Sequence, residues 1–295
     1  MKKIVKGFVI TSVVMIVVGI GLFIGGIVSA GGISAARSAL DGYEFYFDDE
    51  GIHFNYGRDH ETGTTASEKQ QYLSGEAVTF GTEDVRSLDL EIGAAQVEIV
   101  ENFSAKDISV QTDGRYDIYV KNGVLYMESK KDMNDHTMLL EIPSNAVFES
   151  VEISVGACQM NIQRIETKKF DVEVGAGQVV IEDLMADDAQ FEIGAGEIIV
   201  DYANVQECIV DVGMGNFEYN GKIARSGDIE CGMGNAEIYL DGYMEDYNYE
   251  IECAAGNVEI DDESFSGLAA ERVINNDADA VMNIECSMGN VTVGF

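Results

Sequence analysis

The chain has 295 residues, of which 18 are Lys or Arg and 53 are Asp or Glu, so its net charge at pH 7 is −35. A body this acidic repels phosphate backbones, which excludes nucleic acid as a partner. The apolar content of 46% is too high for an acidic disordered tail, and the length suffices for one or two folded domains.

The N-terminal segment has the pattern of a membrane anchor. Phe8–Val28 is almost wholly apolar, and as a helix its 21 residues would span a hydrocarbon layer of about 30 Å. Lys2, Lys3 and Lys6 precede this span, whereas all the acidic residues follow Arg37. This bias predicts a single-pass cell-membrane protein with a cytoplasmic N-terminus and an extracellular body.

Residues 1–36 would then form a cytoplasmic stub and a transmembrane helix whose partner is membrane lipid. A signal peptide cleaved near Val28-Ser29-Ala30 is the alternative, although its apolar run would be longer than is usual. Residues 37–76 predict a hairpin and a linker outside the membrane. Aromatic runs flank the acidic turn Asp48-Asp49-Glu50-Gly51, which is typical of a hairpin, and Gly57–Glu76 is polar and aperiodic.

Residues 77–295 repeat one short pattern. It reads apolar, acidic, apolar, Gly, small, Gly, amide, apolar, and the first glycine recurs every 19 residues at 156, 175, 194, 213 and 232. The equivalent positions 254 and 287 follow after longer steps, so insertions lie between the last units. The 63 residues between Gly93 and Gly156 leave room for two degenerate units. A fixed period of this kind is the signature of a repeat architecture.

Alternation of apolar and polar residues on both sides of the glycine bend predicts two short strands per unit. Because one strand cannot bury its apolar face alone, successive units must stack on a common core. We therefore predict an all-β fold, a parallel β-solenoid of roughly 19-residue repeats over 77–295, preceded by one transmembrane helix. The predicted core residues before the bend are Val172, Phe191, Val210, Ile229, Ile251 and Ile284. Those after it are Val179, Ile198, Phe217, Val258 and Val291, followed by Ile181, Val200, Ile238, Ile260 and Val293.

A membrane span followed by these acidic–apolar–Gly strands resembles the bacterial putative-adhesin family of β-strand repeats. The resemblance covers roughly Ser87–Phe295, and Leu140-Glu-Ile-Pro-Ser144 ahead of a repeat is also typical of that family. It implies a membrane-anchored cell-envelope protein and carries no catalytic motif that could be transferred to this chain.

Stacking aligns equivalent residues of successive units. Carboxylates two residues before the bend predict an outward acidic ladder of Glu173, Glu192, Asp211, Glu230, Glu252 and Glu285. Such a row chiefly keeps the surface soluble, and its sharper interpretation is a series of weak divalent-cation sites of about millimolar affinity. Three residues after the bend, side-chain amides predict a second ladder that hydrogen-bonds along the stack.

The cysteines and tyrosines have structural interpretations. Cys231, Cys253 and Cys286 replace Ile or Val just before the bend, which predicts buried thiols rather than zinc ligands. Four tyrosines between residues 239 and 249, interspersed with carboxylates, can decorate strands or contact a sugar or a protein.

Motifs for catalysis are missing from the sequence. His53, His60 and His136 share no metal-ligand spacing, and no hydrolase, metalloprotease or P-loop motif is present. We therefore predict no catalytic residues, no cofactor and no enzyme activity. The expected function is a non-enzymatic, adhesin-like binding or structural module that meets a protein or glycan at the cell surface. The alternative is a regulatory component of an envelope-stress response that acts through a membrane partner.

The C-terminal end of the stack needs a cap. Asn290–Phe295 completes the last repeat with no polar capping unit, which would leave unpaired strand edges exposed at this end. We expect Ser264–Arg272 to form one or two helical turns that fold over this end.

Overall fold

The computed structural model describes residues 43–48, 51–56, 70–71, 77–112, 116–129, 136–261, 263–266 and 270–295. The chain divides into two units, Met1–Thr65 and Ala66–Phe295. The predicted transmembrane segment Phe8–Val28 lies outside the described residues, and among those that are described no helix is long and apolar enough to cross a membrane.

In the first unit, β1 (Tyr43–Asp48) pairs antiparallel with β2 (Gly51–Tyr56), so the predicted hairpin forms with Asp48 opposite Gly51. The predicted linker is not wholly free of regular structure. β3 (Gln70–Gln71) lies within that linker but belongs to the second unit, where it pairs antiparallel with β8 (Tyr116–Lys121).

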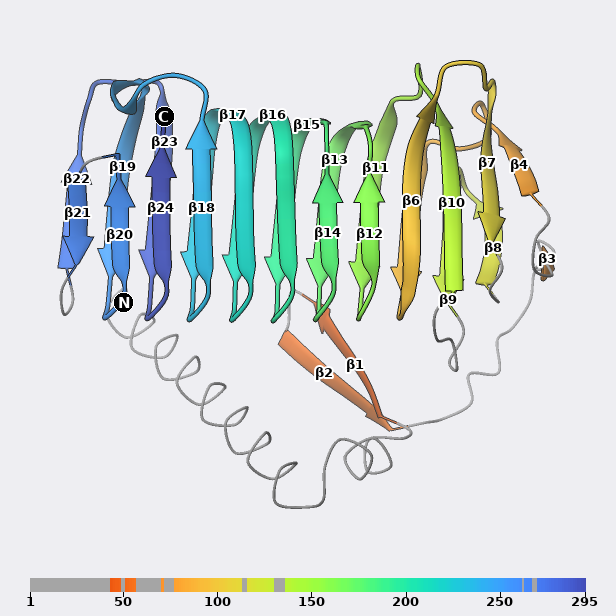
Figure 1. Cartoon of the computed structure of the whole chain (residues 1–295), viewed down its shortest axis with the longest axis horizontal. Helices are drawn as coiled ribbons and strands as arrows, with labels where there is room; N and C mark the ends of the chain where they lie inside the picture. Colours follow the sequence, from red (N-terminus) through yellow and green to blue (C-terminus); the bar gives the residue numbers. More distant parts are fainter. Residues whose placement is uncertain are drawn as a thin grey trace. The chain divides into compact units, whose positions relative to one another are not determined.

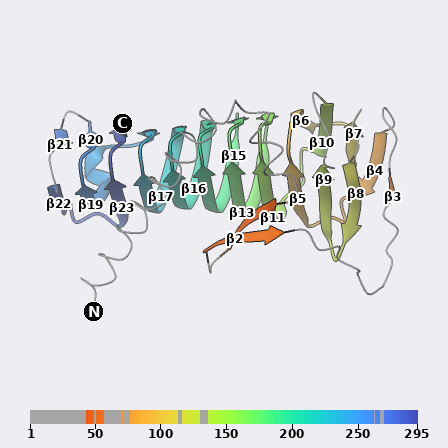
Figure 2. The same ribbon diagram turned by 90° about the horizontal axis from the view of Figure 1, so that it is seen from below.

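The second unit is all-β and forms a solenoid of parallel coils (Figures 1 and 2). We call the strands before the bends the first sheet and those after them the second sheet. In spatial order the first sheet contains β9 (Val124–Ser129), β5 (Ser87–Ile92), β11 (Phe148–Val155), β13 (Ile165–Val174), β15 (Leu184–Ile193), β16 (Glu197–Val212), β17 (Asn216–Cys231), β23 (Ala280–Cys286) and β19 (Tyr247–Cys253). The second sheet contains β10 (His136–Pro143), β6 (Ala95–Asn102), β12 (Gln159–Ile162), β14 (Gln178–Ile181), β16, β17, β18 (Asn235–Leu240), β24 (Asn290–Gly294) and β20 (Asn257–Ile260).

The core lies between the two sheets and consists of the residues that the alternation predicted. Each predicted inward residue before or after a bend is at most 2% exposed, which confirms the pattern. Val172, Phe191, Val210 and Ile229 lie in register in successive coils, and the rings of Phe170 and Phe217 pack against Phe191 with centroids 6.0 and 5.1 Å away. The strands therefore pair in register because each coil repeats the apolar positions of its neighbour.

The order of the coils differs from the order of the chain at both ends. The last coil, β23 and β24, lies between β17–β18 and the preceding coil, β19 and β20 (Figure 1). At the other end β9 and β10 lie outside β5 and β6, so the region after Gly93 supplies one parallel rung rather than two units. Stacking in strict chain order was therefore the wrong expectation for the terminal coils.

Antiparallel strands cover both ends. At one end β22 (Ala270–Ile274) pairs with β19 and β21 (Glu263–Ser266) pairs with β20. At the other, β7 (Asp107–Thr112) pairs with β10, β4 (Ala77–Gly81) pairs with β7, and β8 pairs with β9. The segment 264–272 thus caps the stack in its described part, but as strands rather than helical turns. The exposed edge at Asn290–Phe295 does not exist, because β24 is an interior strand.

The bends need glycine because the backbones of adjacent coils come very close there, not because the backbone angle φ is positive. Among the described glycines, positive φ occurs only at Gly123, Gly221 and Gly242, none of them in a repeat bend. A Cβ added to Gly215 would lie 2.2 Å from the carbonyl oxygen of Gly196 and 2.4 Å from Cγ2 of Ile193. From Gly177 onward, the second glycine of the bend therefore lets one coil lie directly on the next.

We expect Gly215→Ala to lower the free energy of unfolding by about 2–3 kcal/mol, because the added methyl group overpacks the bend. Gly93→Ala is the matched control, since its Cβ would meet only Ser129 Oγ at 3.4 Å. Chemical denaturation of both variants measures the difference, and equal losses would contradict the close-approach explanation.

The coil order can be tested by cross-linking at the outward amide positions. Asn235 is the register partner of Asn290, not of Asn257, so Asn235→Cys with Asn290→Cys should react with a short bifunctional thiol reagent. Asn235→Cys with Asn257→Cys should react far less, because Asn290 lies between the two positions. Stacking in chain order would give the reverse result, and the native cysteines are buried and supply the background measurement.

Candidate binding surfaces

The outer face of the first sheet carries the acidic ladder. Because the last coil is inserted, Glu230 pairs in register with Glu285, and Glu285 with Glu252, so Glu230 and Glu252 are not neighbours as chain order implied. The ladder also extends beyond the predicted members. In spatial order it runs through Glu128, Glu91, Ser154, Glu173, Glu192, Asp211, Glu230, Glu285, Glu252 and Glu271.

A second acidic row lies beside the ladder, two residues earlier in each strand. It contains Asp89, Glu152 and Asp171 in adjacent coils, with Asp228 and Glu250 farther along. Burial, followed by repulsion from Glu91, Glu152 and Glu128, raises the pKa of Asp89 to about 6. Two rows side by side therefore concentrate negative charge on one face.

Several ladder members share this electrostatic effect. Burial is the largest cause in each case, and neighbouring carboxylates add to it. It raises the pKa values of Glu91, Glu173, Asp211 and Glu230 in the ladder, and of Asp171 in the second row. The protein therefore holds these carboxylates in a setting that disfavours their charged form.

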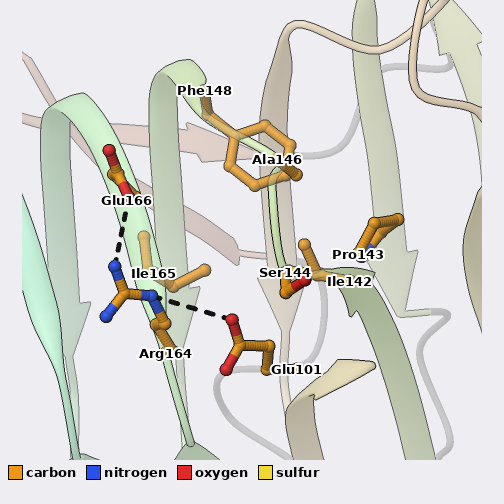
Figure 3. A pocket seen from close by; sticks show the side chains of 9 residues that line it. All are labelled: Glu101, Ile142, Pro143, Ser144, Ala146, Phe148, Arg164, Ile165 and Glu166. Atoms are coloured by element: carbon orange, nitrogen blue, oxygen red, sulfur yellow. Dashed lines mark hydrogen bonds and ion pairs between the residues drawn. The ribbon is translucent and has the colours of Figure 1, made fainter. Parts of the chain in front are cut away.

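Few cations offset this charge. Arg164 is the best connected of those in the described residues, with its guanidinium 3.1 Å from Glu166, 3.8 Å from Glu101 and also paired with Asp183 (Figure 3). It lies where β12 turns into β13, beside a cavity of about 10 Å³ that has room for about one water molecule. Arg164 therefore fastens adjacent coils together and is neutralised by its neighbours. Sequence reasoning missed this cluster, because its carboxylates come from three separate coils.

The predicted cation sites remain a prediction. Within the described residues, no three His, Cys, Asp or Glu side chains are grouped so that they could hold a metal ion. A flat row offers each ion few oxygens, whereas calcium takes six to eight. Any divalent cation bound by the acidic ladder would therefore keep most of its water ligands.

The outer face of the second sheet carries the predicted amide ladder. Asn290 Nδ2 donates to Asn235 Oδ1 over 2.9 Å, and Asn235 Nδ2 donates to Asn216 Oδ1 over 3.0 Å. Farther along, Gln178 Nε2 donates to Glu197 Oε2 over 2.6 Å. These bonds confirm that the amides connect the coils along the stack, and they make this face less charged than the first sheet.

All five cysteines are buried and unpaired, which confirms the prediction for Cys231, Cys253 and Cys286 and adds Cys158 and Cys208 to the core. The inserted coil places Cys286 between Cys231 and Cys253, and the thiols of Cys231 and Cys286 donate to the carbonyl oxygens of Gly234 and Gly289 in their own bends. Burial raises the pKa of Cys158 to about 11 and that of Cys208 to about 12. Those two thiols therefore stay protonated and unreactive at neutral pH.

The tyrosine cluster divides into a buried pair and an exposed pair. Tyr247 and Tyr249 are core residues, and their hydroxyls donate to the carbonyl oxygens of Ile223 and Met244. Tyr239 and Tyr243 are exposed, and the ring of Tyr239 covers Gly294 on the adjacent strand. The interpretation that the tyrosines are structural residues of the strands therefore holds for Tyr247 and Tyr249.

One larger hollow, of about 330 Å³, lies over β6, β7 and β10. Gln96, Glu98, Gln111, Thr137 and Leu139 are among the residues that line it. Glu98 is its one ionisable lining residue, so the hollow offers no acid–base pair. The acidic face is thus the stronger candidate for a functional surface.

The raised pKa of Asp89 gives the stability a pH dependence. The carboxyl of Asp89 binds its proton more tightly in the folded protein than in the unfolded chain. The stabilisation that this protonation contributes is therefore complete below pH 3.8 and is lost as pH rises through about 6. We expect the thermal midpoint to be higher at about pH 5 than at about pH 7.5, and Asp89→Asn to reduce that difference. Asp187, which is exposed on β15, is the control: Asp187→Asn should leave the difference unchanged. A midpoint that rises from pH 5 to 7.5 would contradict the prediction.

The comparisons with known proteins identify the family. The sequence pattern of the family described as Toastrack DUF4097 matches residues 96–294, whereas no curated protein matches the chain. A solved “putative adhesin” from Parabacteroides merdae shares 17% identity, with a TM-score of 0.41 over 75% of this chain and 95% of that one. A “putative lipid binding protein” from Parabacteroides distasonis shares 13% identity, with a TM-score of 0.41 over 75% and 96%.

A “putative cell adhesion protein” from Clostridium sporogenes shares 13% identity, with a TM-score of 0.32 over 76% of this chain and 99% of that one. Likenesses this distant carry no functional argument. The family pattern, in contrast, spans the coils from β6 to β24 and confirms the resemblance seen in the repeats. This chain is therefore a member of the Toastrack DUF4097 family.

Proposed function

We propose that this chain is a non-enzymatic, adhesin-like binding module, held at the outer side of the cell membrane by Phe8–Val28. The observation that carries the proposal is the acidic face of the first sheet, where the carboxylates of the acidic ladder run along the stack in register and a second, interrupted row lies beside them. Successive carboxylates repeat about every 4.8 Å, which suits an extended partner better than a small molecule.

The charge of this face defines the class of partner. A surface of one sign attracts a partner of the opposite sign over a distance and repels partners of its own sign. The partner is therefore a protein segment or glycan that carries several positive charges. Burial and, after it, mutual repulsion raise the pKa values of Glu173, Asp211 and Glu230. A bound cation should relieve the repulsion, because it favours the ionised carboxylates.

The rest of the described surface supports binding rather than catalysis. The cavity beside Arg164 is too small for a substrate, and the hollow over β6, β7 and β10 holds one ionisable side chain. The buried cysteines are not positioned as nucleophiles, since each donates or packs inside the core. Recognition by a long, rigid face needs none of these groups.

The test compares two faces of one molecule. Cells that carry the full-length chain should bind beads coated with a cationic peptide, and Glu173→Gln, Glu192→Gln, Asp211→Asn and Glu230→Gln together should reduce binding about tenfold or more. The matched control changes four carboxylates on the second sheet, Glu98, Glu218, Glu237 and Glu259, to Gln.

Because both variants lose the same net charge, equal loss of binding would contradict a role for the acidic face. Protease added to the intact cells checks the orientation separately, since it should digest the body if the body lies outside. Full protection of the body would contradict the extracellular location without bearing on what the acidic face binds.

A further inference from the structure

Three exposed methionines form one continuous row at the tips of adjacent bends. Met214, Met233 and Met288 are 41%, 38% and 55% exposed. The backbone N–H of Met233 donates to Gly213 O, and that of Met288 donates to Gly232 O, each over 2.8 Å. The three residues therefore occupy the same position in three successive coils, about 4.8 Å apart.

The insertion of the last coil creates this row. In the sequence, Ala255 lies at the bend between those of Met233 and Met288, but in space it lies beyond Met288, where its N–H donates to Ser287 O. On the other side, Met214 follows Ala195, because its N–H donates to Gly194 O. The methionine row, Met214, Met233 and Met288, is thus bounded by alanine at both ends.

Each methionine stands in the same local setting. A carboxylate of the acidic ladder lies three residues before it, and an asparagine of the amide ladder lies two residues after it. The three carboxylates are Asp211, Glu230 and Glu285, and the three amides are Asn216, Asn235 and Asn290. The outermost coil keeps the same pattern, with Glu252 and Asn257, but has Ala255 in place of methionine.

We propose that the methionine row binds one soft monovalent cation, Cu⁺ or Ag⁺, through its three thioether sulfurs. Thioethers are soft ligands that select Cu⁺, whereas Ca²⁺ and Mg²⁺ take oxygen. A methionine side chain has three rotatable bonds, so the two outer sulfurs can bend toward the ion held by Met233. The adjacent carboxylates supply negative charge that attracts the cation and offsets its charge.

The proposed site is independent of the acidic face as a binding surface for a macromolecule. Thioethers are neutral and lie at the edge between the two sheets, so a cationic polymer gains little from them. Conversely, the site does not need the second acidic row or any residue of the N-terminal coils. Failure of one proposal therefore leaves the other standing.

The test uses the full-length chain in detergent, with ¹³C-labelled methionine methyl groups and Ag⁺ as the probe. The methyl signals of Met214, Met233 and Met288 should shift together and saturate with one ion. Met185, which is 36% exposed, has no methionine as a register partner and accepts a hydrogen bond from Arg164, is the internal control and should not shift in the same range. If Ag⁺ bound only to the buried thiols, the methyl signals of the methionine row would not shift, and that result would contradict the proposal.

Substitution by leucine keeps the size of the side chain and removes the sulfur. Met233→Leu should weaken Ag⁺ binding at the row about 100-fold and Met288→Leu about tenfold, because the central ligand holds the other two together. Met185→Leu should change nothing, and far-ultraviolet circular dichroism checks that each variant is folded. Independent shifts of the three methyl signals, or a Met185 shift at the same Ag⁺ concentration, would overturn the proposal.

Discussion

The structure depends on how closely one bend lies on the next. The carbonyl oxygen of one bend glycine occupies the space where the next bend would have a Cβ, as at Gly196, Gly215 and Gly234. This contact fixes the register of the strand that leaves the bend. The N–H of Asn216 donates to Gly196 O, and the strands then pair without a shift from Glu197 and Asn216 to Val200 and Tyr219. Once register is fixed, each side chain is stacked on its equivalents, and the core columns and surface ladders follow.

Exact stacking has opposite effects on apolar and charged residues. Columns such as Val172, Phe191, Val210 and Ile229 gain contact with each added coil. A column of carboxylates gains repulsion instead, which adds to burial in raising the pKa values of Glu173, Asp211 and Glu230. The protein can keep the carboxylate columns because the apolar columns stabilise the fold. Carboxylates retained at this cost are best explained by a surface that has to be acidic.

The repeat made the fold predictable from the sequence, and it also hid the order of the coils. Apolar alternation identified the core, and the bend position identified the acidic and amide ladders and the buried cysteines. It did not reveal that β24 lies between β18 and β20, because Asn257 and Asn290 begin strands that fit equally well on Asn235. The choice is made by the connecting segment, where Asn276 and Asn248 hydrogen-bond to the backbone of the crossover. The same limit explains why neither the methionine row nor the Arg164 cluster was predicted.

The inserted coil has a mechanical consequence. In a stack that follows chain order, tension on one end peels off the outermost coil, one hydrogen bond at a time. Here residue 295 follows β24, which is paired on both sides, with β18 and with β20. Tension applied through this residue must therefore shear two strand interfaces at once before any coil can unravel. In a module that holds a partner under tension, the exchanged order of the last two coils therefore resists unravelling of the stack.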